Sequence, residues 1–159
     1  MVSLVDKQTG GITNVLSLTL SLDTNAYADG DLLADVQELA SATRIDVGTG
    51  IIQTLTVIDK DDQGGALDVY FTSVATTWGT ENSAPTITDA VAASIQGSVS
   101  VTSADYYDLG GVRVAHINSI GMPVKSPSNS DSLYVAVIGR ATATYTASGI
   151  VLNIGILID

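Results

Sequence analysis

Residues 51–75 combine strand-like alternation with a cluster of carboxylates more clearly than any other part of the chain. Apolar side chains occupy every second position in Leu67, Val69 and Phe71, whereas residues 51–58 carry apolar groups at odd and even positions alike. Alternation predicts β-strands, and two apolar faces predict a strand that is buried on both sides or covered by a neighbouring subunit. We therefore expect two strands, joined into a hairpin by the acidic, glycine-bearing turn at residues 59–65.

Several other segments also predict strands. Residues 14–22 place leucine at every second position, opposite a run that is mostly serine and threonine. Further strand-like segments lie at residues 95–102, 112–118, 132–140, 141–147 and 149–158. About eight strands at this spacing, with at most one or two short helices, predict an all-β fold, an antiparallel β-sandwich of jelly-roll type. The apolar C-terminus requires pairing within a sheet or against another chain.

The chain length and patterning predict one domain. The chain has 159 residues without an internal repeat, which is enough to bury a core, so we expect a single sandwich domain at residues 14–159 behind an N-terminal arm or edge strand at residues 1–13. Two loops and a helix complete the expected organisation: loops at residues 23–31 and 121–132, the second exposed, and a short helix within residues 87–94 capped by Thr88 or Asp89.

Residues 31–43 leave the choice between helix and strand open. Leu32, Val36 and Leu39 lie at helical spacing behind a possible cap at Asp31. A bulged strand containing Leu33, Val36 and Leu39 would serve a sandwich equally well.

The charge distribution argues against a nucleic-acid-binding protein. The net charge is -11, and the six basic residues are scattered along the chain, so no cluster can follow a phosphate backbone. The high negative charge favours solubility and the avoidance of self-association. Alternatively, it allows the protein to function next to nucleic acid or other polyanions without binding to them. No cysteine is present, so disulfides and thiolate metal sites are excluded. The first apolar stretch is interrupted at alternate residues, so we expect neither a signal peptide nor a membrane span.

The acidic turn offers the chain's metal candidates. Asp59, Asp61, Gln63 and Gly64 fit the opening of a calcium-binding loop. Gln63 stands where Asp or Asn is expected, and Tyr70 stands where a bidentate Glu would close the loop. We therefore favour an acidic turn at the surface and predict no metal or cofactor, with Asp59 and Asp61 as the only residues to test. A second acidic loop could add ligands to a shared site from Asp23, Asp29 and Asp31.

Two unique side chains are the other candidates. Trp78 lies in polar surroundings, where it either plugs one end of the sandwich or anchors a partner. His116 is the sole histidine, and no nucleophile-elbow pattern such as G-x-S-x-G accompanies it, so a structural histidine and a protein that is not an enzyme are favoured. A carbohydrate-binding jelly roll that stacks sugars on Trp78, Tyr106 and Tyr107 is the alternative function.

Two segments resemble a known family. Residues 26–73 and 134–159 are similar to the head decoration, or cement, proteins that tailed bacteriophages encode beside their major capsid protein. The features that carry this resemblance are Tyr27 followed by Asp29-Gly30-Asp31, then Asp59-Lys60 and Leu67-Asp68 before an aromatic strand.

The resemblance implies a structural virion protein without catalytic or ligand residues. Such proteins are β-rich and often trimeric, and they stabilise the shell from the capsid exterior. The implied partners are the major capsid protein and further copies of the chain, with no nucleic acid and no membrane. The implied location is the virion, after synthesis in the host cytoplasm. For residues 31–43 the resemblance implies a strand.

Overall fold

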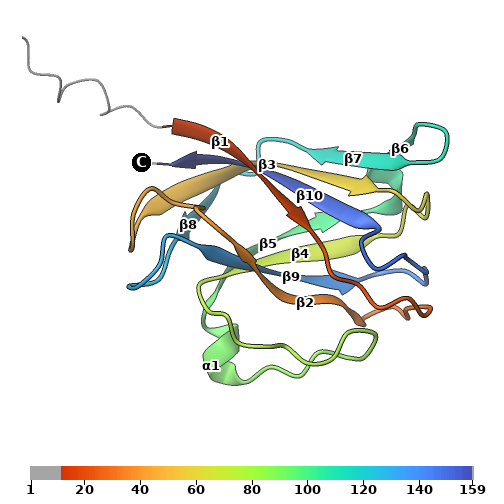
Figure 1. The fold of residues 1–159 in the computed structure, drawn as a ribbon, viewed down its shortest axis with the longest axis horizontal. Helices are drawn as coiled ribbons and strands as arrows, with labels where there is room; N and C mark the ends of the chain where they lie inside the picture. The colour runs from red at the N-terminus through yellow and green to blue at the C-terminus, as the bar shows by residue number, and fades with distance from the viewer. Residues whose placement is uncertain (1–11, 159) are drawn as a thin grey trace, which may run out of the picture.

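The computed structural model describes residues 12–158, which form two facing sheets (Figure 1). This part of the chain contains ten strands, one short helix and one turn of 3-10 helix. Their bounds are β1 Ile12–Thr19, β2 Leu32–Leu39, β3 Thr49–Asp59, β4 Leu67–Thr72, α1 Asp89–Ala92, β5 Ile95–Val101, η1 Ser103–Asp105, β6 Tyr106–Asp108, β7 Arg113–Ile117, β8 Met122–Lys125, β9 Leu133–Gly139 and β10 Ile150–Ile158. Ile12 and Thr13 of the predicted arm thus belong to β1, and the rest of that arm lies outside the described residues.

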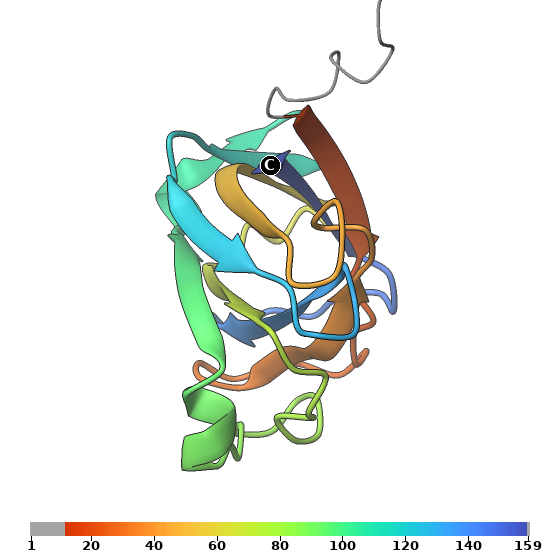
Figure 2. The ribbon, with the colours of Figure 1, turned by 90° about the vertical axis from the view of Figure 1, so that its left-hand side faces the viewer.

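The strand order is that of a jelly roll. A six-stranded sheet has the order β1-β10-β3-β7-β6, with β8 also paired to β3, and a four-stranded sheet has the order β2-β9-β4-β5. Every pairing is antiparallel, and without β6 and β8 each sheet contributes four strands to a double Greek key. The predicted fold class is confirmed, with ten strands in place of about eight. The two layers are seen from one end in Figure 2.

The predicted hairpin at residues 51–75 is wrong. β3 lies between β10 and β7 in one sheet, whereas β4 lies between β9 and β5 in the other. Residues 59–65 therefore carry the chain from one sheet to the facing one. Alternation fixes which face of a strand is buried, but it does not fix which strand pairs with it. In the structure the apolar strand β10 pairs with β3, and the apolar strand β9 pairs with β4.

A bulge explains why β3 is apolar at both odd and even positions. Ile52 pairs with Ile156 and Thr54 pairs with Gly155, so Gln53 has no partner in β10. The extra residue shifts the alternation, and both Ile52 and Leu55 face the core. The apolar residues at odd and even positions of β3 therefore lie on the same buried face, because the bulge at Gln53 shifts the alternation by one residue.

Three further segments differ from or resolve the predictions. Residues 31–43 contain the strand β2, whose register shifts on either side of Ala34, as in the bulged alternative. The predicted loop at residues 121–132 contains β8, because Val124 is buried beside β3. Residues 141–147 form no strand, although Ala143 and Tyr145 are buried. The predicted short helix is confirmed as α1, capped by Thr88.

The core lies between the two sheets. Buried side chains from both inner faces fill it, including Ile52, Leu55, Val57, Val69, Phe71, Val135, Val137, Leu152, Ile154 and Ile156. Tyr27 and Tyr145 close the core at the end opposite the start of β1, with ring centroids 6.2 Å apart. The Tyr27 hydroxyl donates to the Leu33 carbonyl and accepts from the Asp23 amide.

Buried tyrosines make the stability of the fold sensitive to alkaline pH. Burial raises the pKa of Tyr27 to about 12, and burial also raises the pKa of Tyr106 and of Tyr145. The unfolded chain releases these protons near pH 10, so the stabilisation is complete below about pH 10 and is lost as the pH approaches the folded pKa. We expect the free energy of unfolding to fall by about 2 kcal/mol through Tyr27 alone. Denaturant titrations at rising pH would measure this, and a constant free energy would contradict it.

Candidate functional site

The outer face of the four-stranded sheet is covered by the chain itself. Residues 73–94, including α1, pass over β2 and β9 (Figure 1). Trp78 is the centre of this cover: only 1% of it is exposed, and its ring centroid lies 5.3 Å from that of Tyr70. It shares a buried cluster with Leu32, Val91, Ala136 and Ile138. The cover therefore adds a partial third layer to the sandwich.

Polar contacts hold this cover in place. The Asp35 carboxylate of β2 accepts from the Trp78 amide at 2.7 Å and from the Thr77 hydroxyl at 2.6 Å. The backbone of Leu32 also exchanges hydrogen bonds with Asn82 and Ser83. Of the two predicted roles, Trp78 therefore has that of a buried plug, although it covers the outer face of a sheet instead of one end of the sandwich. A partner anchor needs an exposed ring, and this ring is covered.

The predicted sugar-stacking trio is not assembled. Trp78 is buried below the cover, and the hydroxyl of Tyr106 is buried at the core side of β6 without a hydrogen-bond partner among the described residues. Tyr107 alone is open, with 72% of its surface exposed. The alternation of β6 explains the difference, because neighbouring residues on a strand point to opposite faces.

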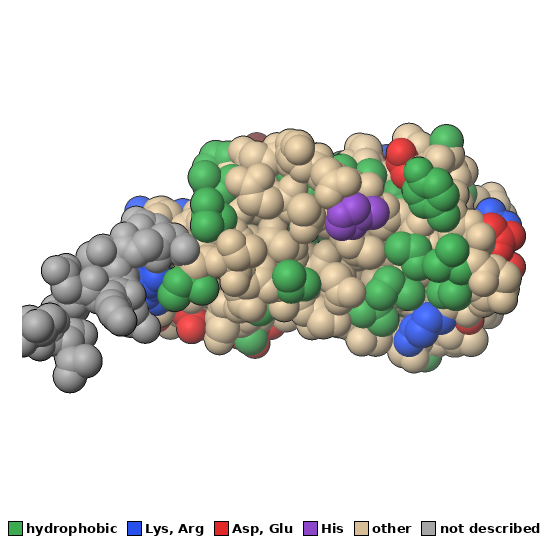
Figure 3. Space-filling model, turned by 90° about the horizontal axis from the view of Figure 1, so that it is seen from above, with side chains coloured by type: hydrophobic (Ala, Val, Ile, Leu, Met, Phe, Trp, Pro, Cys, Tyr) green, Lys and Arg blue, Asp and Glu red, His purple; other side chains and the backbone are tan. Residues whose placement is uncertain are grey.

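No described residue covers the outer face of the six-stranded sheet. Apart from Lys125, which lies opposite Thr49 at the end of β8, its strands place no Asp, Glu, Lys or Arg on this face. We refer to its outward positions other than Thr49 and Lys125 as the uncharged face, and Figure 3 shows it with charged side chains at its margins. The register places the following residues on it: Thr13, Val15, Ser17, Thr19, Ile51, Thr54, Thr56, Ile58, Tyr107, Val114, His116, Pro123, Val151, Asn153, Gly155 and Leu157. A sheet face on which the described strands place no carboxylate is unexpected in a chain of net charge -11.

Exposed apolar groups are interspersed on the uncharged face. Val15 of β1 is 65% exposed and Ile51 of β3 is 38% exposed. Both of these strands pair with β10. Depletion of charge, together with exposed apolar and aromatic groups, is the composition of protein interface cores. The uncharged face is therefore suited to burial against another protein surface.

Among the described residues of the uncharged face, His116 and Tyr107 are the titratable side chains. The Nδ1 of His116 lies 2.5 Å from the Thr56 hydroxyl on the adjacent strand. No carboxylate from residues 12–158 shares this face with it to orient the imidazole as a catalytic triad requires. The geometry assigns His116 to a cross-strand contact.

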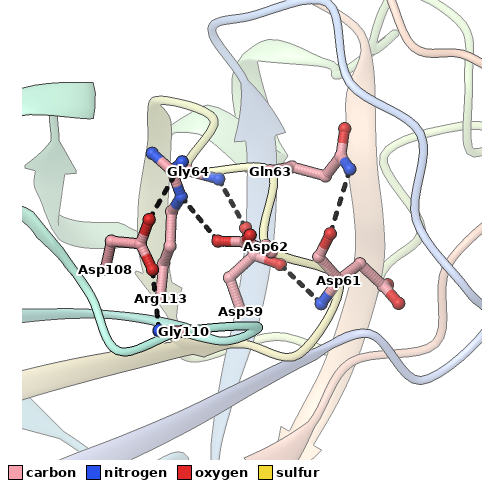
Figure 4. Close-up of polar contacts among 8 residues, drawn as sticks. All are labelled: Asp59, Asp61, Asp62, Gln63, Gly64, Asp108, Gly110 and Arg113. Carbon is pink, nitrogen blue, oxygen red and sulfur yellow. Dashed lines mark hydrogen bonds and ion pairs between the residues drawn. The ribbon is translucent and has the colours of Figure 1, made fainter.

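The acidic turn is a folded connection whose first carboxylate is buried. Asp59, predicted at the surface, is 0% exposed, and its two oxygens accept from the amides of Asp61 at 3.0 Å and Gly64 at 2.6 Å (Figure 4). Gly64 adopts φ +62°, and a Cβ there would lie 2.8 Å from Arg113 Cδ. Asp62 forms an ion pair with Arg113 at 2.8 Å, and that hydrogen bond raises the pKa of the guanidinium.

The remaining candidate carboxylates also close loops. Asp61 accepts from the amide and the hydroxyl of Thr146. Asp23 accepts from the Asn25 amide, which lowers its pKa, and Asp31 accepts from the Ala28 amide. Within residues 12–158 no group of three or more metal-ligating side chains could hold a metal ion. Nor does this part of the chain contain a helix long and apolar enough to cross a membrane.

The fold is thus that of an all-β jelly-roll protein with one sheet face that no described residue covers and on which the described strands place no carboxylate. No protein-family model and no curated protein matches the chain.

Solved structures offer only distant likenesses. The chain is 14% identical to the VP2 subviral particle of infectious bursal disease virus, with a TM-score of 0.24 over 99% of this chain and 45% of that one. The Gt strain structure of the same virus gives 10% identity and a TM-score of 0.23 over 93% and 42%. The Gx strain structure gives 13% and 0.21 over 99% and 45%. The chain spans less than half the length of these proteins.

Proposed function

We propose that this protein is a structural virion component, not an enzyme: a decoration protein that binds the outer surface of a phage head as a trimer and stabilises the shell. The observation that carries the structural role is the uncharged face on an otherwise acidic jelly roll. The sequence resemblance to phage cement proteins supplies the setting, with the major capsid protein and two further copies as partners.

Electrostatics favours self-association through the uncharged face. Two copies that each carry a net charge of -11 repel one another over most of their surfaces. The uncharged face is where two copies meet without bringing carboxylates together, and its exposed Val15, Ile51 and Tyr107 gain from burial. In the trimer that we propose, the uncharged faces of the three subunits meet around the threefold axis, so that each contacts both neighbours, and nucleic acid and membranes are not partners.

Insertion of one charge into the uncharged face is expected to dissociate the trimer. Ser17 is an exposed serine in the middle of β1, and its glutamate variant buries an unpaired carboxylate at the subunit contact. Such a charge costs enough to weaken assembly by about 100-fold or more. The matched control is Ser98→Glu, which adds the same charge to an exposed position of β5 on the opposite sheet.

Sedimentation equilibrium and co-sedimentation with empty heads test this proposal together. The heads are assembled from the major capsid protein encoded beside the gene, as the resemblance implies. We expect the natural chain and Ser98→Glu to sediment as trimers that bind heads, and Ser17→Glu to sediment as a folded monomer. A natural chain that is monomeric and does not bind heads would refute the decoration role.

A further inference from the structure

Two loops lie side by side at the end of the sandwich that faces the viewer in Figure 2: residues 40–48, which lead into β3, and residues 126–132, which follow β8. We refer to them together as the loop pair. Ile45 and Val47 lie at its surface, 65% and 45% exposed. Neither residue belongs to the uncharged face, so the proposed contact between subunits does not include them.

Hydrogen bonds between the two loops hold the loop pair in one conformation. The Val47 amide donates to the Pro127 carbonyl at 3.0 Å, and the Ser126 amide donates to the Gly48 carbonyl at the same distance. Below them the hydroxyls of Thr43 and Ser126, both buried, lie 2.9 Å apart. A preorganised loop loses little conformational entropy on binding, so the exposed side chains of the loop pair are suited to docking.

The backbone of Val47 is strained. This residue adopts φ +59°, a left-handed conformation that β-branched residues rarely take. It is the third residue of a turn in which the Gly48 amide donates to the Ile45 carbonyl at 2.9 Å, and glycine or asparagine fits that position without strain. Backbone strain of this kind is concentrated at functional sites. Valine therefore presents an aliphatic group here at a cost in stability, which points to a use for that group.

Charge distinguishes the loop pair from the opposite end of the sandwich. The loop pair and the adjoining Lys125 contain two basic and two acidic residues, so their formal charges cancel. At the opposite end, residues 20–31, 59–66, 102–113 and 140–149 contain eight acidic and only three basic residues. An acidic protein approaches another protein surface most easily where its own charge is balanced, and exposed apolar groups gain from burial there.

We propose that the loop pair is the part of the trimer that docks on the shell, with Ile45 and Val47 of each subunit buried against the major capsid protein. The inference rests on the proposed decoration role and adds to it which end of the sandwich faces the shell. A cyclic trimer is polar, so a surface that one subunit presents on one side is repeated three times there. Three linked contacts strengthen one another, so a modest contact at each loop pair attaches the whole trimer firmly.

The same charge inserted at either end of the sandwich tests the docking end. Ile45→Asp places a carboxylate at the contact and is expected to weaken binding to empty heads by about 100-fold or more. Sedimentation equilibrium is expected to show that this variant remains a folded trimer. The matched control is Leu109→Asp at the opposite end, where the leucine is 64% exposed, and it is expected to bind heads as the natural chain does.

A second variant separates docking from folding. Val47→Asn removes the aliphatic group and introduces a residue that tolerates the left-handed conformation. The thermal midpoint of unfolding is therefore expected to stay the same or rise, while head binding weakens by about 10-fold. Unchanged head binding by Val47→Asn would contradict the proposed contact.

The remaining outcomes separate this inference from the decoration role. Head binding by Ile45→Asp equal to that of the natural chain would overturn the inference and leave the decoration role standing. Loss of binding in Leu109→Asp alone would assign the shell contact to the opposite end. Dissociation of the Ile45→Asp trimer would assign the loop pair to a contact between copies of the chain. A natural chain that does not bind heads would refute the decoration role itself and this inference with it.

Discussion

Replacement of Trp78 by alanine is expected to lower the free energy of unfolding by about 3–5 kcal/mol. The indole is almost fully buried between the cover and the four-stranded sheet, where it contacts Tyr70. Its removal leaves a cavity below residues 73–94, and the hydrogen bonds of that segment to Asp35 lose the packing that holds them in register. Chemical denaturation monitored by far-ultraviolet circular dichroism would measure the loss.

The control Trp78→Phe separates packing from polarity. Phenylalanine keeps an aromatic ring against Tyr70 and removes Nε1, which has no acceptor among the described residues. We therefore expect a loss of about 1–1.5 kcal/mol for this variant. Equal losses for the alanine and phenylalanine variants would show that ring packing contributes little.

Hydrogen exchange would locate the effect of Trp78→Ala. If the cover opens as a separate unit, amides of residues 73–94 lose protection first, while β3 and β10 in the other sheet stay protected. The cover makes the molecule asymmetric: residues 73–94 bury the outer face of the four-stranded sheet, whereas no described residue covers the outer face of the six-stranded sheet. Its loss is expected to expose apolar groups such as Leu32 and Ile138.

The fold class could be predicted from the sequence because apolar and polar side chains alternate along the strands of a jelly roll. Leu16, Leu18 and Leu20 point inward as the pattern predicts, and β10 is paired on both edges as its apolar character requires. Strand partners were not predictable in the same way. The turn at residues 59–65 has the length and glycines of a hairpin, yet only long-range pairing decides that it connects two sheets.

The candidate site was only partly visible in the sequence. The uncharged face draws on β1, β3, β6, β7, β8 and β10, so its lack of charge emerges only when the register places these strands side by side. A local signal exists at Thr13, Val15, Ser17 and Thr19, where alternate positions carry no charge. The burial of Trp78 was one of two predicted outcomes, and the choice depended on the Asp35 contacts 43 residues away in sequence.

Replacement of Asp59 by alanine is expected to lower the free energy of unfolding by about 2–4 kcal/mol, because this candidate metal ligand of the sequence pattern is a buried acceptor of backbone hydrogen bonds. Its carboxylate is fully buried and accepts two backbone amides of the turn. Truncation leaves those donors without an acceptor, and a buried unsatisfied donor costs about 1–3 kcal/mol. Thermal or chemical unfolding would report this loss.

Two variants in the same turn distinguish the buried carboxylate from its acidic neighbours. Asp62→Ala removes an ion pair with Arg113 in which both side chains are more than a third exposed, so a loss of roughly 1 kcal/mol or less is expected. Asp59→Asn keeps one acceptor but turns an amide group toward one of the two donors, so its loss should approach that of Asp59→Ala. Equal, small effects for Asp59→Ala and Asp62→Ala would contradict a structural role for the buried carboxylate. This turn carries the chain from β3 in one sheet to β4 in the other. The hydrogen bonds that Asp59 accepts from the turn therefore stabilise the connection between the two sheets and not only a surface loop.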